Sequence, residues 1–489
     1  MILKLNPFLL FFSGTEYIAN MSKKYMSKDK IHFEISERKM LLHLVDVFSI
    51  VVALYVVGQF FALDYLKSSV LDWVNLVVLI IYLKIIGTIF ELYNLQVSSN
   101  EFSIIKSTIL TVTTTVLAYF LTPVYSPVLP SNRLQIVAFL LVVFFSLILW
   151  RLFYVRFLAS KRFHQKALLV CDKEQLNELV AGLETIDPHY KIIAYVSHCE
   201  TDKSKGEDLL DIKCINPTDL IAFVKENYIT EIVIGTQKPD SITTELYQQL
   251  LKLLESGKVI REYSQVYEEK TQRIPVHYVE RDFYRFFPFS RSNQNRLYLL
   301  IVRVLEIIVS IVGLLITLLL IPFIFLMNTI ANKGSLFYTQ ERVGKDGTVF
   351  NILKFRTMIE NAESAKAVFT AVNDNRVTAF GKFMRKTRMD EFPQFVNILK
   401  GEMAVIGPRP ERPFFVKEIA AIMPFYETRH IIKPGLTGWA QVNYSYGETI
   451  EDSLIKLQYD LYYIKHRSFY LDFNIALKTI TTILFYRGQ

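Results

Sequence analysis

Residues 297–327 read LYLLIVRVLEIIVSIVGLLITLLLIPFIFLM, an apolar run broken by Arg303 and Glu306 near its start and by Pro322 near its end. The run is long enough to cross a bilayer. Basic residues flank it on both sides, however, and because Lys and Arg mark the cytoplasmic side, both ends are predicted to face the cytoplasm. Proline kinks a helix, so we predict a re-entrant membrane helix that turns near Pro322; a plain fifth span is the alternative. The flanking residues are Arg285, Arg291 and Arg296 before the run and Lys333, Arg342, Lys345, Lys354 and Arg356 after it.

Four further apolar stretches of spanning length precede this helix, at about residues 41–62, 73–95, 104–125 and 134–157. Basic residues lie before the first stretch and after the fourth, so both ends of this four-helix bundle are predicted to be cytoplasmic. Lys84 and Glu91 lie inside the second stretch, where pairing within the bundle or snorkelling is the simpler interpretation and an intramembrane functional site is the alternative. Residues 1–36 are predicted to be a flexible tail, in which Met21 could be an alternative start.

Between the bundle and the re-entrant helix, short apolar runs alternate with amphipathic segments. Runs at 166–171, 192–196 and 231–235 are typical of strands, and segments at 174–183, 219–228 and 243–256 are typical of helices. This alternation predicts a small, mostly parallel α/β domain. The turn after the first run reads Cys171-Asp172-Lys173-Glu174, and no G-x-G occurs in the chain. We therefore predict a Rossmann-like domain with a degenerate nucleotide loop and no dinucleotide cofactor.

Composition agrees with a membrane part joined to a soluble part. Of the 489 residues 51% are hydrophobic and 21% are charged, and the net charge of +8 suits anionic partners such as phosphates and lipid headgroups. No helix-turn-helix, zinc or RNA-binding signature is present, so nucleic acid is not predicted as a partner. The three cysteines, Cys171, Cys199 and Cys214, predict neither a disulfide framework nor a metal site.

The last third of the chain concentrates charge around Asp390-Glu391, which follow Arg385, Lys386 and Arg388. The simpler interpretation is that Asp390 caps a helix that runs to about residue 400 and ends at Gly401. The functional interpretation is that adjacent carboxylates among cations bind Mg²⁺ and a diphosphate, and that the aspartate attacks phosphorus. The two interpretations are compatible.

Two further motifs follow the carboxylates. Gly407-Pro408-Arg409-Pro410-Glu411 is predicted to be a rigid turn, and it either fixes the Arg409 guanidinium for bidentate phosphate contact or is a structural turn. Lys433–Asn443 carries turn glycines around Trp439, which is predicted either to pack against a base or to fill a core. The apolar segment 469–485 is predicted either to lie along the membrane interface or to pack within the domain.

Taken together, residues from about 295 to the end resemble the bacterial sugar transferase family, the monotopic phosphoglycosyl transferases. The matching pieces are Lys354–Met358, Arg388–Gln394, Gly407–Glu411 and Lys433–Asn443, in the family's order. The whole chain resembles the long form that starts exopolysaccharide, capsule or O-antigen synthesis. The resemblance implies a tail at 1–36, a bundle at 37–160, the Rossmann-like domain at 161–290 and a mainly α catalytic domain at 291–489.

The resemblance also implies a reaction. Asp390 matches the nucleophile that attacks a UDP-sugar and releases UMP, and Glu391 matches its partner in placing Mg²⁺. Arg409 would neutralise phosphate charge. The sugar phosphate would pass to undecaprenyl phosphate at the cytoplasmic face of the bacterial inner membrane. The remaining residues expected to bind phosphate are Lys354, Arg356, Arg385 and Arg388.

Two rival functions remain. A membrane nucleotide-sugar dehydratase would need a glycine-rich NAD loop, which the sequence lacks. A non-enzymatic scaffold for polysaccharide assembly would not need the intact Asp390-Glu391 and Arg409. The sequence does not disclose which sugar is transferred, and a homodimer is an assembly that it leaves open.

Overall fold

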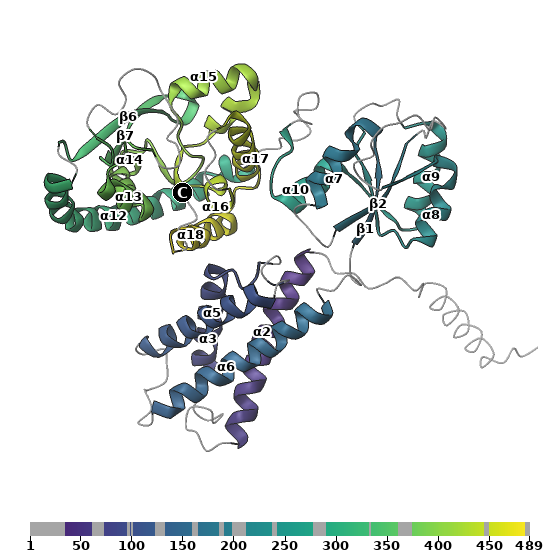
Figure 1. The fold of residues 1–489 in the computed structure, drawn as a ribbon, viewed down its shortest axis with the longest axis horizontal. Coiled ribbons are helices and arrows are strands. Elements are labelled where there is room, and N and C mark those ends of the chain that lie inside the picture. Colours follow the sequence, from purple (N-terminus) through teal and green to yellow (C-terminus); the bar gives the residue numbers. More distant parts are fainter. Residues whose placement is uncertain are drawn as a thin grey trace, which may run out of the picture. The chain divides into compact units, whose positions relative to one another are not determined.

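The computed structural model describes residues 35–60, 73–94, 98, 101–122, 133–158, 165–184, 190–197, 212–236, 242–276, 290–331, 334–359, 374–444 and 449–484. The predicted tail lies almost entirely outside these residues. Two compact units are formed, one by residues up to Leu42 with Leu152–Tyr263, the other by His43–Arg151 with residues from Ser264 onward (Figure 1).

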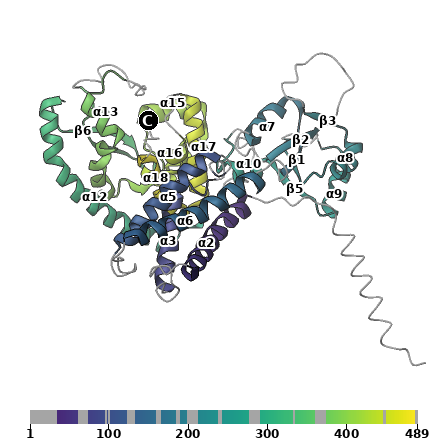
Figure 2. The ribbon, with the colours of Figure 1, turned by 60° about the horizontal axis from the view of Figure 1, so that its bottom comes forward.

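The four N-terminal apolar stretches form helices (Figure 2). Three are long and apolar enough to cross a membrane, whereas the second is a shorter apolar helix. It ends at Ile89 because a turn follows in which Glu91 has a left-handed backbone with φ of 59°. The prediction that Glu91 lies inside this helix was therefore wrong. The helices are α2 (Ile35–Phe60), α3 (Trp73–Ile89), α5 (Glu101–Leu121) and α6 (Arg133–Phe153), and the π-helical turn η1 (Tyr154–Leu158) follows α6.

The central α/β domain has the predicted parallel sheet. Its five strands are all parallel, in the order β3-β2-β1-β4-β5. Figure 1 shows α7 on one face and α8 with α9 on the other, which buries both faces of the central strands. The elements are β1 (Gln165–Val170), η3 (Lys173–Gln175), α7 (Leu176–Glu184), β2 (Tyr190–Val196), β3 (Lys213–Ile215), η4 (Pro217–Asp219), α8 (Leu220–Glu226), β4 (Glu231–Ile234), α9 (Thr244–Glu255) and β5 (Val259–Glu262).

Two features of this domain were missed. Strands β3 and β5 have only three and four residues, too few for a periodic signal. Cys214 is disulfide-bonded, so the expectation of cysteines without disulfides was wrong, whereas Cys171 is a buried free thiol.

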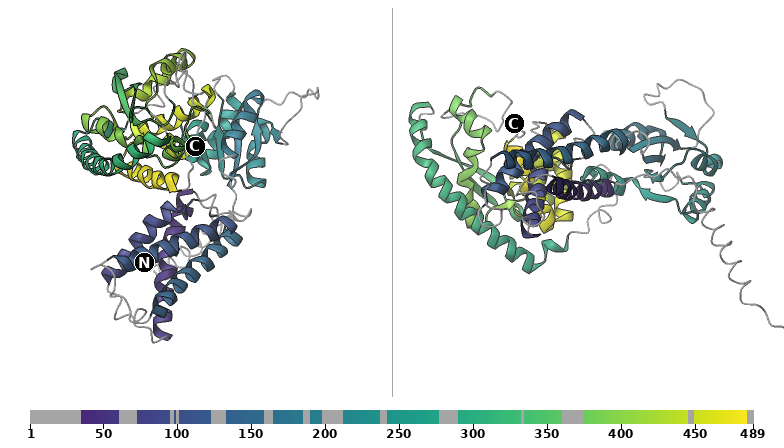
Figure 3. Two further views of the ribbon diagram at one scale, coloured as in Figure 1. Left: turned by 60° about the vertical axis from the view of Figure 1, so that its left-hand side comes forward. Right: turned by 90° about the horizontal axis from the view of Figure 1, so that it is seen from below.

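The longest helix of the C-terminal domain is α12 (Arg296–Ala331), which runs through Pro322 without ending. Figure 3 shows this helix curving along its length. The structure therefore shows one continuous, curved helix where a turn was expected at Pro322. The further elements are α10 (Tyr263–Thr271), η7 (Arg291–Asn293), β6 (Phe337–Val343), η8 (Lys345–Gly347), β7 (Val349–Phe355), α13 (Ala379–Lys386), η9 (Met389–Gln394), α14 (Phe395–Lys400), β8 (Ala404–Ile406), α15 (Pro413–Ile422), η10 (Pro424–Ile431), β9 (Gly435–Thr437), α16 (Trp439–Asn443), α17 (Ile450–His466) and α18 (Phe469–Leu484).

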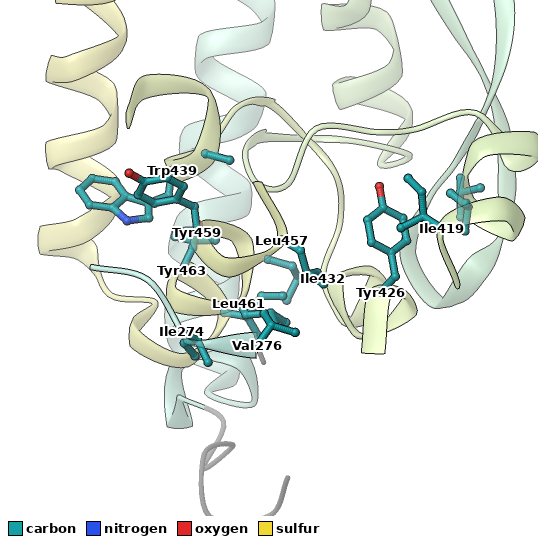
Figure 4. Close-up of a cluster of buried hydrophobic side chains, with 14 of the residues drawn as sticks. Ile274, Val276, Ile419, Tyr426, Ile432, Trp439, Leu457, Tyr459, Leu461 and Tyr463 are labelled. Atoms are coloured by element: carbon teal, nitrogen blue, oxygen red, sulfur yellow. The ribbon is translucent and has the colours of Figure 1, made fainter. Parts of the chain in front are cut away.

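The core of this domain lies around α17 (Figure 4). Trp439 is buried in it, and its Nε1 donates to the Gln272 carbonyl, so this tryptophan fills a core. Ile274 and Val276 belong to the same core, although they precede α12 in the chain. Helix α18 buries one side in the domain, as Ile475 does, and leaves other large apolar side chains, such as Phe473, exposed.

Candidate active site

The segment that carries Asp390 and Glu391 is fastened to α12. The Arg303 guanidinium on α12 donates two hydrogen bonds of 2.7 Å each, to the carbonyls of Ile398 and Leu399. These carbonyls lie in the last turn of α14, where the Ile398 carbonyl also accepts from the Gly401 N–H at 3.0 Å. Gly313 of α12 lies so close to the Phe395 ring that any Cβ there would collide with it. Helix α12 thus positions the segment that carries Asp390 and Glu391, a pair that we call the dyad.

The local backbone differs from the predicted cap. Arg388 occupies the N-cap position with φ of 58°, and Asp390 is the second residue of the short 3-10 helix η9. The expectation that Asp390 is the capping residue was therefore wrong. The expected end of the helix at Gly401 is confirmed, because Gly401 has φ of 87° and follows the last residue of α14.

Glu391 is held by three cations on one oxygen. Its Oε1 lies 3.2 Å from Arg409 Nη2, 3.5 Å from Lys354 Nζ and 3.6 Å from Arg388 Nη1. Burial alone would raise the pKa of Glu391, but the charges of Arg409, Lys354 and Arg388 outweigh burial and hold that pKa below its ordinary value. Glu391 is therefore a fixed, ionised carboxylate.

Asp390 has the opposite environment, although it is the next residue and is equally buried, at 8% exposure. Across the described ranges no side chain donates a hydrogen bond to its carboxylate. Burial and then the negative charge of Glu391 raise its pKa, and Lys354 and Arg385 oppose that rise. Two neighbouring carboxylates whose pKa values are pushed apart are typical of two different chemical roles.

Lys354 and Arg356, one motif in the sequence, lie in different surroundings. Asn397 holds β7 against α14, because its Oδ1 accepts from the Leu353 N–H at 3.0 Å and its Nδ2 donates to the Asn351 carbonyl at 2.8 Å. The next residue, Lys354, thereby reaches Glu391. Arg356 is instead buried beside Gly334, and its Nη1 lies 3.5 Å from Ser335 Oγ. It is not one of the three cations on Glu391.

Arg385 on α13 donates from Nε to Thr357 Oγ1 at 2.9 Å. Its charge is among the groups that lower the pKa of Asp390. Of the five cations predicted from sequence, the structure brings three to Glu391 and one near Asp390.

The turn that carries Arg409 is paired with the Lys433–Asn443 motif. Strands β8 and β9 run parallel, the Gly407 N–H donates to the Thr437 carbonyl at 2.9 Å, and the Gly435 N–H donates to the Pro408 carbonyl at 2.8 Å. Two motifs that lie apart in the sequence therefore form one structural unit that presents Arg409.

Sequence reasoning missed the charged residues behind this turn. Arg429 Nη2 donates to the Arg409 carbonyl at 2.9 Å and lies 2.7 Å from Asp460 Oδ2. A carboxylate on the buried face of α17, beside Leu457 and Leu461, was the available signal, because charged residues are almost never fully buried unless they are paired.

The donor set fits a single Mg²⁺ that is completed by substrate. Within the part of the chain that the structure describes, no group of three or more His, Cys, Asp or Glu side chains could hold a metal ion. Mg²⁺ is usually bound through one or two carboxylates, with waters and substrate phosphates as further ligands. The adjacent carboxylates of Asp390 and Glu391 offer that set, and the ion pairs described above join the three cations to Oε1 of Glu391.

Comparison with known proteins finds one matching family model and several relatives. Residues 297–486 match the model of the bacterial sugar transferase family. An Aeromonas hydrophila protein named UDP-N-acetylgalactosamine-undecaprenyl-phosphate N-acetylgalactosaminephosphotransferase is 36% identical over 52% of this chain and 59% of its own length. A Klebsiella pneumoniae UDP-glucose:undecaprenyl-phosphate glucose-1-phosphate transferase is 37% identical over 40% of this chain and 42% of its own length. The chain thus spans less than two thirds of these two relatives.

A shorter relative is covered more fully. A Bacillus subtilis (strain 168) protein, named for transfer of N-acetylgalactosaminyl 1-phosphate to undecaprenyl phosphate, is 41% identical over 31% of this chain and 86% of its own length. The similarity to this relative thus extends over most of its length.

Proposed function

Because this chain belongs to the bacterial sugar transferase family, we propose that it transfers a sugar 1-phosphate from a UDP-sugar to undecaprenyl phosphate and releases UMP. One observation carries the proposal. Asp390 accepts no hydrogen bond from a described side chain and lies next to a carboxylate that three cations hold. In such a pair, Asp390 can act as the nucleophile, while the ionised Glu391 holds the surrounding cations in place.

The reaction we propose has two steps. First, an Asp390 carboxylate oxygen attacks the phosphorus next to the sugar, a P–O bond forms, and the bond to UMP breaks with its electron pair leaving on UMP. Second, a phosphate oxygen of undecaprenyl phosphate attacks the same phosphorus and the Asp390 O–P bond breaks. The product is an undecaprenyl diphosphate sugar, and the Asp390 carboxylate is regenerated.

The chain's own charges explain how the first step proceeds. Phosphoryl transfer depends mainly on positioning and on stabilising charge on the phosphate oxygens. Lys354, Arg388 and Arg409 supply three cations beside Asp390, and Glu391 fixes them in one place. Its negative charge also raises the Asp390 pKa, which makes that carboxylate more basic. Bound Mg²⁺, held by Asp390 and Glu391, would supply further neutralisation of the donor diphosphate.

Membrane attachment is part of the proposal. We propose that α12 is a re-entrant helix, bent at Pro322, with both ends on the cytoplasmic face of the bacterial inner membrane. Its basic flanks support this orientation. Because Arg303 and Gly313 fasten the dyad segment to α12, the helix would hold the site near the headgroups where a lipid phosphate lies. The product would start exopolysaccharide, capsule or O-antigen synthesis.

The test is UMP release by purified full-length protein in detergent with Mg²⁺ and undecaprenyl phosphate. The named relatives differ in their sugar, so the donors are UDP-glucose, UDP-galactose and UDP-N-acetylgalactosamine. With a donor alone, intact-mass analysis should show one added sugar phosphate that is absent from Asp390→Asn. Folded protein that releases no UMP with any donor would count against the proposal and favour a scaffold.

A further inference from the structure

We propose that Arg429 and Asp460 are positioning residues, which set the place of Arg409 over Glu391 without touching substrate. The inference rests on the proposed function, because its readout is the rate at that site. It assigns a role in the reaction to a buried ion pair that contacts the backbone of the Arg409 turn.

Arg429 joins three separate elements through one guanidinium. Its Nη2 lies 2.7 Å from Asp460 Oδ2 on α17 and donates to the Arg409 carbonyl at 2.9 Å, and its Nη1 donates to Tyr426 Oη at 2.5 Å. The two charged side chains are only 4% and 1% exposed. The planar fork of arginine can hold several acceptors in fixed directions, which a lysine cannot do.

Arg429 contacts Arg409, which is the residue that reaches Glu391 of the dyad. Arg409 accepts from Arg429 through its backbone carbonyl, and its own Nη2 reaches Glu391 Oε1 at 3.2 Å. Pro408 and Pro410 restrict the backbone on both sides of it. A shift of the Arg409 carbonyl therefore moves the Cα from which the guanidinium reaches the carboxylate.

A purely structural role is a weaker explanation of this pair. Desolvating two charges is costly, and replacing a buried ion pair by apolar residues of similar volume is often neutral or stabilising. An apolar pair could fill the same space between η10 and α17, but it could not donate a hydrogen bond to the Arg409 carbonyl. The pair is also neutral overall, so it acts through position rather than through its field on the dyad.

The decisive variant replaces both charges, as Arg429→Met with Asp460→Leu, in the full-length protein. We expect folded protein whose kcat/KM for the UDP-sugar is about 100-fold lower, since a displacement of about 1 Å can cost that factor. We also expect a higher KM for the UDP-sugar, because a displaced Arg409 guanidinium neutralises the donor phosphate less well, whereas partial unfolding would leave KM unchanged. Arg429→Lys keeps the positive charge beside Asp460 but loses the planar guanidinium that also reaches the Arg409 carbonyl. If the double variant does not fold, this variant tests the positioning role, and we expect it to lower kcat/KM as well.

The matched control is Glu268→Gln. Glu268 lies 2.7 Å from Lys465 Nζ and so forms an ion pair with the same helix, α17, without contacting the Arg409 turn. This variant should change the unfolding temperature and leave both kcat and KM as they are. Double-variant protein with wild-type kcat/KM, or with activity reduced only in proportion to its folded fraction and an unchanged KM, would overturn the positioning role. Wild-type protein without UMP release would instead reject the proposed function.

Discussion

The α/β domain and the C-terminal domain are built in opposite ways. The first is regular: in β1 the run from Ala167 to Val170 is almost completely buried between helices on both faces of a parallel sheet. The second fastens short elements through single side chains, as Asn397 does for β7 and Arg303 does for α14. The charges that explain chemistry lie in the second domain, where irregular backbone brings distant motifs together.

The regular domain shows why its fold does not reveal a function. Ligands of doubly wound sheets bind outside the carboxyl ends of the strands, where the strand order reverses. Here that position lies between β1 and β4, and β1 is followed by the buried thiol of Cys171 instead of a glycine-rich loop. Gly235 after β4 packs closely against Leu179 of α7. Function therefore has to be argued from the site on the other domain.

The largest expected effect is at Asp390. Asp390→Asn should lower the transfer rate by a factor on the order of 10⁴, because removing a nucleophile removes the covalent path. Thermal stability should stay the same or rise: the folded-state pKa of Asp390 is raised, so its ionised form destabilises the folded protein above that pKa. UMP release and an unfolding curve on the same preparation test both statements. A variant that loses activity through unfolding would contradict this account.

A smaller effect is expected at Arg409. Arg409→Lys keeps a positive charge but loses the planar fork, and removing one such stabilising donor typically costs about 10²–10³ in rate. The pKa of Glu391 should rise, since Arg409 is the largest of the charges that lower it. Steady-state rates measured at several pH values test this prediction. Lys386→Gln is a suitable control, because it removes a neighbouring cation that is not among the three on Glu391.

The pH dependence should separate the two carboxylates. Activity should fall about tenfold per pH unit below the raised pKa of Asp390, because the protonated acid does not attack phosphorus. The folded-state pKa of Glu391 is lowered, so the stability it contributes is present above its unfolded pKa of about 4.3 and is lost only at lower pH. Activity should thus disappear on acidification before the fold does. Rates and circular dichroism at matched pH values check this order, and simultaneous loss of both would contradict it.

The sequence predicted the regular parts better than the site. Hydropathy located all four N-terminal helices, but it extended the second past Ile89, because an apolar window does not detect the left-handed turn at Glu91. Lys354 and Arg356 lie two residues apart in one motif and were both expected to bind phosphate, yet only Lys354 is among the three cations on Glu391. Arg429 and Asp460 were not found: the carboxylate on the buried face of α17 was a signal, but the sequence does not show which side chain of η10 pairs with it.

The smallest effect on kcat/KM is expected in the α/β domain. It directly tests the contrast between the α/β domain and the C-terminal domain. Tyr190 donates to Glu231 Oε2 at 2.9 Å inside this domain, and Arg261 pairs with the same carboxylate. Tyr190→Phe should cost about 1.5–3 kcal/mol of stability, the usual net value of a hydrogen bond to a charged group, and should leave kcat/KM within about twofold of wild type. Denaturant unfolding and UMP release measure the two quantities separately. If folded Tyr190→Phe protein lost tenfold or more in kcat/KM, the regular domain would be coupled to the reaction, and chemistry could no longer be assigned to the irregular domain alone.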